Sequence, residues 1–254
     1  MSAHDLRKPR HGRRKSRTPL LAASAAACMV LFNSWPAQAA VVWDGEASQG
    51  TAVFGSVECA SPGSLVTAAQ DDGHGTVFRY TKSVGTYRCE SRGIQVGGSR
   101  YDFANDSTYW FGWEQKFSVV PAGSDWVPWQ WKSYPNATQN YPLLMTVGDG
   151  LVRLVYVGPG EAWKTIWSQP VEAFAWNRVA IGIHTSTSAD SGWAELYYNG
   201  VRQTFSDGTT RYAGRTWDSA NEPKWGAYDR DNTTTEIVNR VGSLKAGTTY
   251  GDVD

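Results

Sequence analysis

The sequence is 254 residues long and carries 24 basic and 24 acidic side chains. Residues 1–39 hold seven of the basic residues and one acidic residue, so residues 40–254 carry 17 against 23, a net charge of −6. A net negative chain argues against a nucleic-acid partner, and any basic patch on it is expected to be local and purposeful.

The N-terminal segment predicts a secretory signal peptide, residues 1–39. Basic residues gather in residues 1–18, an apolar run follows from Pro19 to Phe32, and then comes Ala37-Gln38-Ala39. These are the three parts of such a leader, and the apolar run is shorter than the roughly 20 residues that a membrane span needs. We therefore expect cleavage after about Ala39, secretion to the extracellular space and no membrane attachment afterwards. Arg13-Arg14 leaves the export route, general or twin-arginine, open.

The remaining chain, residues 40–254, is long enough for one large domain with its own core. Cys28 lies in the leader, so Cys59 and Cys89 are the two cysteines that remain. An exported chain meets an oxidising compartment, which favours a disulfide between them over two buried free thiols. No Cys/His cluster in the sequence has the spacing of a zinc site.

Short β-rich runs separated by turn signals fill this domain, and no stretch of twelve residues keeps a helical apolar period. Asn199-Gly200, directly after the run 194–198, is a strong hairpin signal. The pattern predicts an all-β sandwich or jelly roll. The predicted strands include Tyr109–Val120, Leu143–Thr146, Leu151–Val157, Arg178–His184, Trp193–Tyr198 and Lys224–Tyr228.

Four runs place polar and charged side chains on one face, because side chains alternate between the two faces of a strand. The opposite face of each run is apolar and suits a core. If the four strands are neighbours, their second faces form a wall of cationic and amide donors for an anionic ligand. The alternative for each residue is an ordinary solvated face. The second faces hold Arg88, Glu90 and Arg92; Gln130 and Lys132; Ala180, Gly182 and His184; and Lys224, Gly226, Tyr228 and Arg230.

This set of side chains favours elimination over hydrolysis. Glycosidic hydrolysis normally uses a pair of carboxylates, whereas the predicted wall offers Glu90 alone, and there is no G-x-S-x-G motif. A uronic acid has a C5 proton next to its carboxylate. Its elimination needs a neutralised carboxylate together with a base and an acid. Gln, Arg and Lys can serve the first need, and Tyr or His the others.

Aromatic residues are dense as well, and twelve of the thirteen Trp residues follow the leader. One core hardly accommodates all twelve, so we expect some of them to line a groove, where aromatic faces stack on sugar rings.

Six segments, in order, resemble the heparin-lyase-I-like and glucuronan-lyase-like polysaccharide lyases, and the resemblance spans about residues 42–254. It implies a β-jelly roll, a concanavalin-like sandwich of two antiparallel sheets with a groove across the concave sheet. The segments are Tyr109-Trp110-Phe111-Gly112-Trp113, Gln130-Trp131-Lys132, Asn140-Tyr141-Pro142-Leu143-Leu144, residues 176–184, residues 192–200 and residues 223–228.

The resemblance also implies roles. Gln130 and Arg88 would bind the substrate carboxylate, and Tyr228 would act as base or acid with Lys224 beside it. Relatives often carry Gln-x-His where this chain has Gln130-Trp131-Lys132, so the expected histidine is His184, with His74 as the alternative. Relatives also commonly have Arg directly after the tyrosine, where this chain has Asp229. The expected substrate-binding residues are Arg92, Lys132, Tyr141, Trp193, Tyr197 and Arg230.

We therefore expect a secreted, monomeric lyase that acts by β-elimination on a 4-linked acidic polysaccharide, glucuronan first and alginate or heparin-like chains next. The alternative is a non-catalytic, lectin-like carbohydrate-binding module. The missing carboxylate pair disfavours a concanavalin-type glucan hydrolase. No cofactor is expected to be required. Such folds allow a structural calcium ion, with candidate oxygen donors at Asp44, Asp71, Asp72, Asp149 and Asp252.

Overall fold

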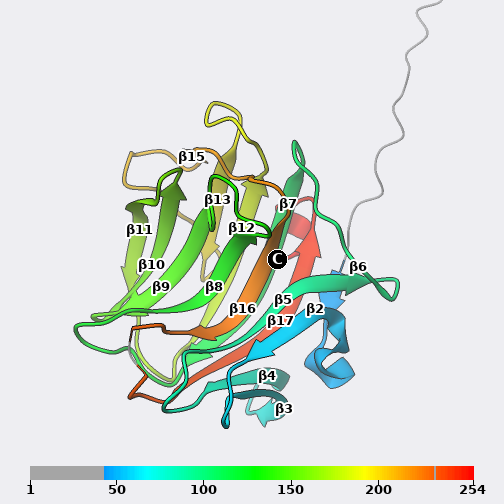
Figure 1. Ribbon diagram of the computed structural model, residues 1–254, viewed down its shortest axis with the longest axis vertical. Helices are drawn as coiled ribbons and strands as arrows, with labels where there is room; N and C mark the ends of the chain where they lie inside the picture. Colours follow the sequence, from blue (N-terminus) through cyan, green and yellow to red (C-terminus); the bar gives the residue numbers. More distant parts are fainter. Residues whose placement is uncertain (1–42, 232) are drawn as a thin grey trace, which may run out of the picture. The chain divides into compact units, whose positions relative to one another are not determined.

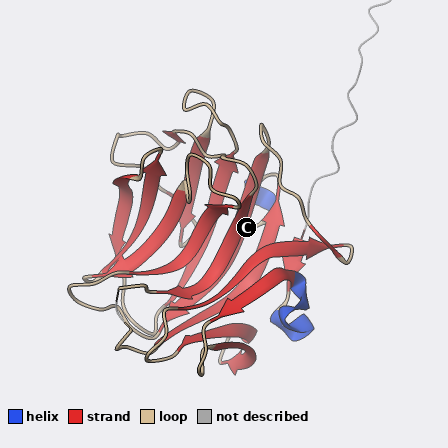
Figure 2. Cartoon of the chain, viewed as in Figure 1, coloured by secondary structure: helices blue, strands red, loops and turns tan. Residues whose placement is uncertain are grey.

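The computed structural model describes residues 43–231 and 233–254, so the predicted signal peptide lies outside the described residues. The described part is all-β, as predicted, with two antiparallel sheets packed face to face (Figure 1). Its helical elements are two short 3-10 helices, η1 (Ala47–Val53) and η2 (Tyr250–Asp252), which Figure 2 shows beside the strands. Within this part, no helix has the length and apolar character needed to cross a membrane.

Sheet A has the strand order β14-β13-β12-β7-β17-β4-β3, with β1 beside β17 and β15 beside β13. Its strands are β1 (Trp43–Gly45), β3 (Leu65–Asp71), β4 (Gly75–Lys82), β7 (Thr108–Phe117), β12 (Trp176–His184), β13 (Trp193–Tyr198), β14 (Val201–Arg202), β15 (Tyr212–Ala213) and β17 (Ile237–Gly247).

Sheet B has the strand order β11-β10-β9-β8-β16-β5-β2, with β6 beside β5, and it faces the viewer in Figure 1. Its strands are β2 (Phe54–Cys59), β5 (Arg88–Val96), β6 (Ser99–Arg100), β8 (Trp126–Ser133), β9 (Leu143–Gly148), β10 (Leu151–Gly158), β11 (Ala162–Pro170) and β16 (Asn221–Tyr228).

Tryptophan side chains fill much of the space between the sheets. Trp113 of sheet A stacks on Trp129 of sheet B with ring centroids 5.5 Å apart and meets Trp225 edge-on at 6.3 Å. Nine of the twelve described Trp residues are buried. We expected some of them to line a groove; most lie in the core instead, because burying large apolar rings is favourable. Of the other three, Trp176 and Trp193 are partly exposed and Trp163 is 54% exposed.

The turn signals behave as predicted. Asn199 and Gly200 have φ of 51° and 77°, the two successive left-handed residues of a type I′ hairpin, and they join β13 to β14. The run predicted as Tyr109–Val120 ends at Phe117. Beyond it the hydroxyl of Ser118, in place of a backbone carbonyl, accepts the bond from the N–H of Val238 at 2.8 Å.

The predicted disulfide is confirmed. Cys59 and Cys89 lie opposite each other in β2 and β5 and are bonded, which ties these strands together beside β16. On its other side β5 meets β16 at Gly226, where a Cβ would lie 2.2 Å from the carbonyl oxygen of Cys89. Only glycine lets the two backbones approach this closely, so β2, β5 and β16 form one tightly spaced unit.

Candidate functional site

Three of the four predicted wall strands are neighbours, in the order β8-β16-β5. Lys224 of β16 lies opposite Gln130 on one side and Arg92 on the other, and Tyr228 lies opposite Arg88. Their side chains project from the face of sheet B that points away from the Trp-rich core. Sequence alternation thus placed these residues on a common surface correctly.

The fourth strand, β12, belongs to sheet A, where it pairs with β7 and β13. The expectation that it adjoins the other three is wrong. His184 therefore lies in a different sheet from Gln130, and it contacts the hydroxyl of Thr108 at 3.1 Å and Asp106 at 3.4 Å. The alternative histidine, His74, binds Glu114 at 2.9 Å, also on sheet A. Neither histidine lines the pockets of sheet B.

Two further predicted substrate-binding residues, Trp193 and Tyr197, also lie in sheet A, on β13. The guanidinium of Arg211 covers the ring of Trp193 at 4.0 Å, and Tyr197 stacks on Tyr250 at 3.9 Å. These rings serve packing on sheet A. Their local pattern could not distinguish the outward face of one sheet from that of the other.

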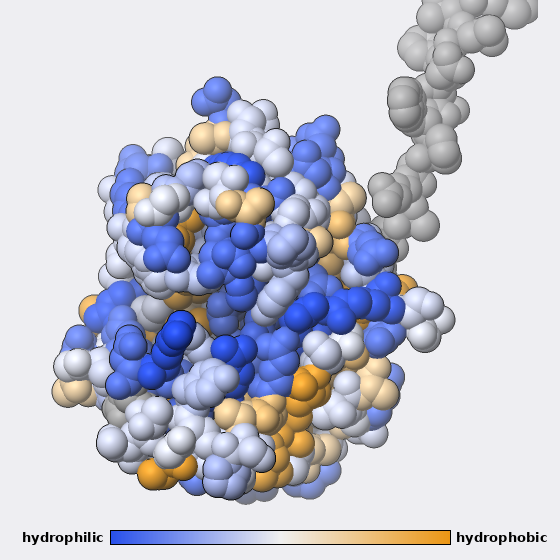
Figure 3. Space-filling view, in the orientation of Figure 1, coloured by the Kyte–Doolittle hydropathy of each residue, from blue (hydrophilic) through white to orange (hydrophobic). Residues whose placement is uncertain are grey.

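A pocket of about 370 Å³ opens on the outward face of sheet B. Figure 3 shows this side of the molecule, with many hydrophilic residues across it. A second hollow of about 500 Å³ continues the first, and both share Val127, Tyr141, Trp163, Tyr228 and Arg230. The two form an extended groove. The first pocket is lined by Arg88, Glu90, Val127, Gln130, Lys132, Asn140, Tyr141, Leu144, Glu161, Trp163, Lys224, Tyr228 and Arg230.

A buried ammonium group lies at the base of the pocket. The side chain of Lys224 is 1% exposed, and its Nζ is 2.9 Å from both Glu58 and Glu90. Burial alone would lower the pKa of Lys224, but Glu90, Tyr134 and Glu58 raise it above its ordinary value. The amide nitrogen of Gln130 donates to Glu90 at 2.6 Å. Lys224 and Glu90 therefore hold Gln130 in place from beneath.

Glu58 of β2 extends this network toward the arginines. It binds Arg88 at 3.2 Å and Arg92 at 3.3 Å. Burial would raise the pKa of Glu58, yet Lys224, Arg92 and Arg88 together hold it below its ordinary value. Glu58 is thus a carboxylate shared by three cations.

Glu222 of β16 forms the outer end of the same network, 2.8 Å from Arg92 and 2.6 Å from Arg100. Sequence reasoning missed both Glu58 and Glu222. Strand alternation was the available signal for Glu222, since it puts this residue on the face of Lys224.

The predicted wall of free cations is therefore largely paired. Five cations (Arg88, Arg92, Arg100, Lys132 and Lys224) face three carboxylates, which leaves an excess of two positive charges. Among the described residues, neither Lys132 nor Arg230 forms an ion pair. These two cations border the open part of the groove.

Lys132 is half-buried. Its Nζ donates to the side-chain oxygen of Asn140 and lies 4.7 Å from the ring centre of Tyr134 and 5.8 Å from that of Tyr141. Burial, and then the nearby ammonium of Lys224, lower the pKa of Lys132 to about 8, although Glu90 acts in the opposite direction. Lys132 is thus a cation that can lose its proton near neutral pH.

Aromatic side chains form the rim of the groove. Tyr228 packs beside the guanidinium of Arg88, whose central carbon lies 5.2 Å from the ring centre. Tyr141 and the exposed Trp163 are 5.3 Å apart on the opposite side. Sequence reasoning did not single out Trp163, because nothing local separates it from the buried tryptophans.

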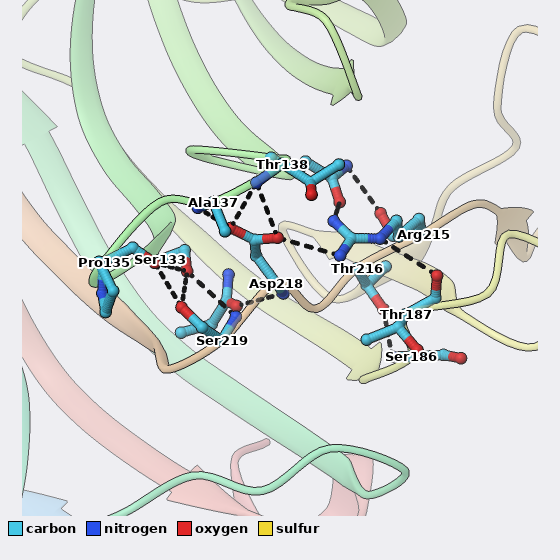
Figure 4. A network of polar contacts seen from close by, with 12 residues as sticks. Ser133, Pro135, Ala137, Thr138, Ser186, Thr187, Arg215, Thr216, Asp218 and Ser219 are labelled. Carbon is cyan, nitrogen blue, oxygen red and sulfur yellow. Dashed lines mark hydrogen bonds and ion pairs between the residues drawn. The ribbon is translucent and has the colours of Figure 1, made fainter.

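A separate polar network anchors the loop between β8 and β9, which carries Asn140 and Tyr141. Asp218 accepts from the backbone N–H groups of Ala137 at 2.5 Å and Thr138 at 3.0 Å, as the dashed lines of Figure 4 indicate. Arg215 donates to Asp218 at 3.0 Å. Although burial would raise the pKa of Asp218, these donors hold it below its ordinary value. The loop is thereby held against the segment that precedes β16.

The residues described by the structure contain no group of three or more His, Cys, Asp or Glu side chains placed to hold a metal ion. Three of the proposed calcium donors have other partners: Asp71 binds Lys116 and Arg240, Asp252 caps η2, and Asp149 accepts from the backbone of Gly123. The structural calcium ion stays an untested expectation, and we assign it no site.

Known proteins resemble the chain in sequence pattern and in fold. A family model described as polysaccharide lyase matches residues 42–242. An endo-β-1,4-glucuronan lyase from the fungus Trichoderma reesei superposes with a TM-score of 0.62 at 15% identity, over 84% of this chain and 97% of its own. An alginate lyase from Corynebacterium sp. superposes with a TM-score of 0.53 at 17% identity, over 80% and 97%. At these identities the likeness shows the jelly-roll fold. No curated protein sequence matches the chain.

The shared carboxylate of Glu58 leads to a stability prediction. Glu58→Gln leaves three cations with less compensation, so we expect the free energy of unfolding at pH 7 to fall by about 1–3 kcal/mol. The pKa of Glu58 is lowered in the folded state. Its contribution is therefore present above the unfolded value of about 4.3 and is lost as pH falls through the folded value. Urea denaturation at about pH 7 and pH 3 measures both effects.

The matched control is Glu172→Gln, because Glu172 is exposed and makes no ion pair in the described part of the chain. It should change the free energy of unfolding by less than about 0.5 kcal/mol. A Glu58→Gln loss that equals the control, or that persists undiminished at acid pH, would contradict the network.

Proposed function

The chain belongs to the polysaccharide lyase family, and from that premise we propose that it cleaves a 4-linked polyuronate by β-elimination in the groove of sheet B. Glucuronan is the first candidate substrate, and alginate or heparin-like chains come next. The observation that carries the proposal is the composition of the pocket. An amide donor, two cations without ion pairs and a tyrosine hydroxyl converge there. Family membership likewise favours an enzyme over a lectin-like module.

The carboxylates of the pocket argue against hydrolysis. Glu90 is 2% exposed and is held by Lys224 and Gln130, so it is not free to act as an acid or a nucleophile. Glu161 lies at the exposed rim, in the turn between β10 and β11. Hydrolysis needs two carboxylates on either side of the scissile bond. Elimination needs no carboxylate from the enzyme. It needs donors to the substrate carboxylate and groups that transfer protons, and residues of both kinds line the pocket.

Gln130 and Arg88 would neutralise the substrate carboxylate. An amide nitrogen has two hydrogens, and Glu90 takes one of those on Gln130. The other can donate to a substrate oxygen. Because Glu90 and Lys224 hold the amide from below, it needs no rearrangement as negative charge moves onto the carboxylate during proton loss. Such preorganised donors are among the strongest contributors to catalysis.

Tyr228 is the proposed proton-transfer tyrosine. Two tyrosines, Tyr141 and Tyr228, line the pocket. Burial, followed by the charge of Glu161, raises the pKa of Tyr141. We therefore assign Tyr141 to binding, together with its neighbour Trp163. The second hollow extends the groove past these rings and provides room for a polymer rather than a single sugar.

Substrate class is tested by incubating the protein with a panel of polyuronates and following the ultraviolet absorbance of the unsaturated uronate that elimination creates. We expect absorbance with glucuronan, or with alginate or heparin-like chains, and none with a neutral β-glucan of equal length. Binding of the acidic oligosaccharide should weaken as salt rises, since ion pairs at a surface groove are screened. Tight, salt-independent binding of the neutral glucan would contradict the proposal.

Two substitutions test the site. Gln130→Ala removes a donor to the developing charge, so kcat should fall on the order of 100-fold or more. Tyr228→Phe removes one hydroxyl and keeps the ring, so kcat should fall at least as far while the substrate still binds. The control is Tyr87→Phe, because Tyr87 touches Tyr228 but does not line the pocket. Wild-type elimination by both variants would refute the assignment.

Secretion is part of the same proposal and is supported by the leader pattern of residues 1–39. The expected mature N-terminus is close to Ala40. The intact mass of protein recovered from the culture medium measures it, and a protein that stays within the cells with residues 1–39 attached would contradict secretion.

A further inference from the structure

Lys132 lines the pocket but lies outside the salt-bridge network. It shares the groove with Gln130 and Tyr228, and its ammonium faces two tyrosine rings and the amide oxygen of Asn140 instead of a carboxylate. The other lysine of the pocket, Lys224, is bound to two glutamates. A lysine that serves only as a fixed positive charge is normally paired with a carboxylate when it is buried this far.

We propose that Lys132, as the neutral amine, is the base that removes the C5 proton of the uronate, and that Tyr228 is the acid. This assignment rests on the proposed function. No histidine can act as the base in this pocket, because both described histidines lie on sheet A. Glu90 is committed to Lys224 and Gln130.

Charged groups on β2, β5 and β16 act on Lys132, and Glu161 and Arg230 line the same pocket. Lys224 and Arg88 oppose its positive charge, whereas Glu90 and Glu58 favour it. Glu222 lies opposite Lys132 in β16, but it is bound to Arg92 and Arg100. Burial is the largest effect and Lys224 the next, and together they lower the pKa of Lys132 to about 8. At pH 8 about half of the amine is therefore neutral, and at pH 7 about one tenth.

The contact with Asn140 suits both protonation states. An ammonium and a neutral amine can each donate a hydrogen to the side-chain oxygen of Asn140, so the nitrogen stays in position when its proton leaves. The Asp218 network holds the loop that carries Asn140. The base is thus positioned independently of its charge, which is a requirement for a group that gains and loses a proton in each turnover.

The lone pair of the Lys132 amine takes the C5 proton, and the C5–H electrons form the C4–C5 double bond while the C4–O4 bond breaks. The departing O4 takes the hydroxyl proton of Tyr228. The products are an unsaturated uronate, a new chain end with a free hydroxyl, a Lys132 ammonium and a Tyr228 phenolate. Transfer of one proton from the ammonium to the phenolate, directly or through water, restores the enzyme.

The decisive variant is Lys132→Arg, because arginine keeps the charge but does not lose its proton at ordinary pH. If Lys132 is the base, kcat should fall at least about 100-fold, while the binding of acidic oligosaccharide, followed by tryptophan fluorescence, changes only a few-fold. Lys132→His should recover a measurable part of kcat. It should also move the acid limb of kcat/KM from near pH 8 toward about 6.5, the ordinary pKa of histidine. The control is Lys245→Arg, because Lys245 lies on sheet A, away from the pocket, where its Nζ donates to the carbonyl of Asp254 at 3.2 Å.

Two results would overturn the inference. Near-wild-type kcat in Lys132→Arg would make Lys132 a binding cation. A wild-type kcat/KM that is already maximal below about pH 6 would exclude a base of this kind, even if the variants fail to fold. A wild-type enzyme that eliminates no polyuronate is a different result, since it refutes the proposed function itself. Elimination by the wild type with an acid limb near pH 8, lost in Lys132→Arg, supports both.

Discussion

The structure of the groove depends on the burial of one ammonium group, that of Lys224. A buried charge costs several kcal/mol unless it is paired with good geometry, and this side chain is 1% exposed. Its partners come from two other strands, Glu90 of β5 and Glu58 of β2. The pairing of Lys224 therefore links β16 to β5 and β2. Through Glu90 it also positions Gln130 on β8.

The same constraint divides the polar residues of sheet B into two groups. Towards β2, four cations and three carboxylates pair with one another. Towards β9, β10 and β11, the network ends, and the groups beyond it are Lys132, Tyr228 and Arg230. Carboxylates that would serve a hydrolase are thus used as structural groups. The residues left free to meet a substrate are donors, a phenol and an amine, which suit proton removal next to a carboxylate.

Local alternation predicted the faces of β5, β8 and β16 correctly, because a period of two fixes which side chains share a surface once a strand has an apolar side. It could not say which sheet a strand joins. A sandwich has two outward faces, both polar, and strands of either sheet show the same alternation. β12 and β13 belong to sheet A, so His184, Trp193 and Tyr197 lie on the other sheet from the groove. The partners of Glu58 were equally hidden, since Lys224 is 166 residues away.

An amine can act as the base only if other residues bind the substrate carboxylate. A substrate carboxylate close to Lys132 would favour its charged form and so remove the base at the moment of binding. The carboxylate must therefore be held by other donors, and the register supplies them. Gln130 lies two residues before Lys132 on the same strand, opposite Lys224, while Arg88 lies two strands away, opposite Tyr228. Gln130 also carries no charge that would compete with the amine for protons. Burial and the ammonium of Lys224 are the main effects that oppose the charged form of Lys132, and Arg88 acts in the same direction.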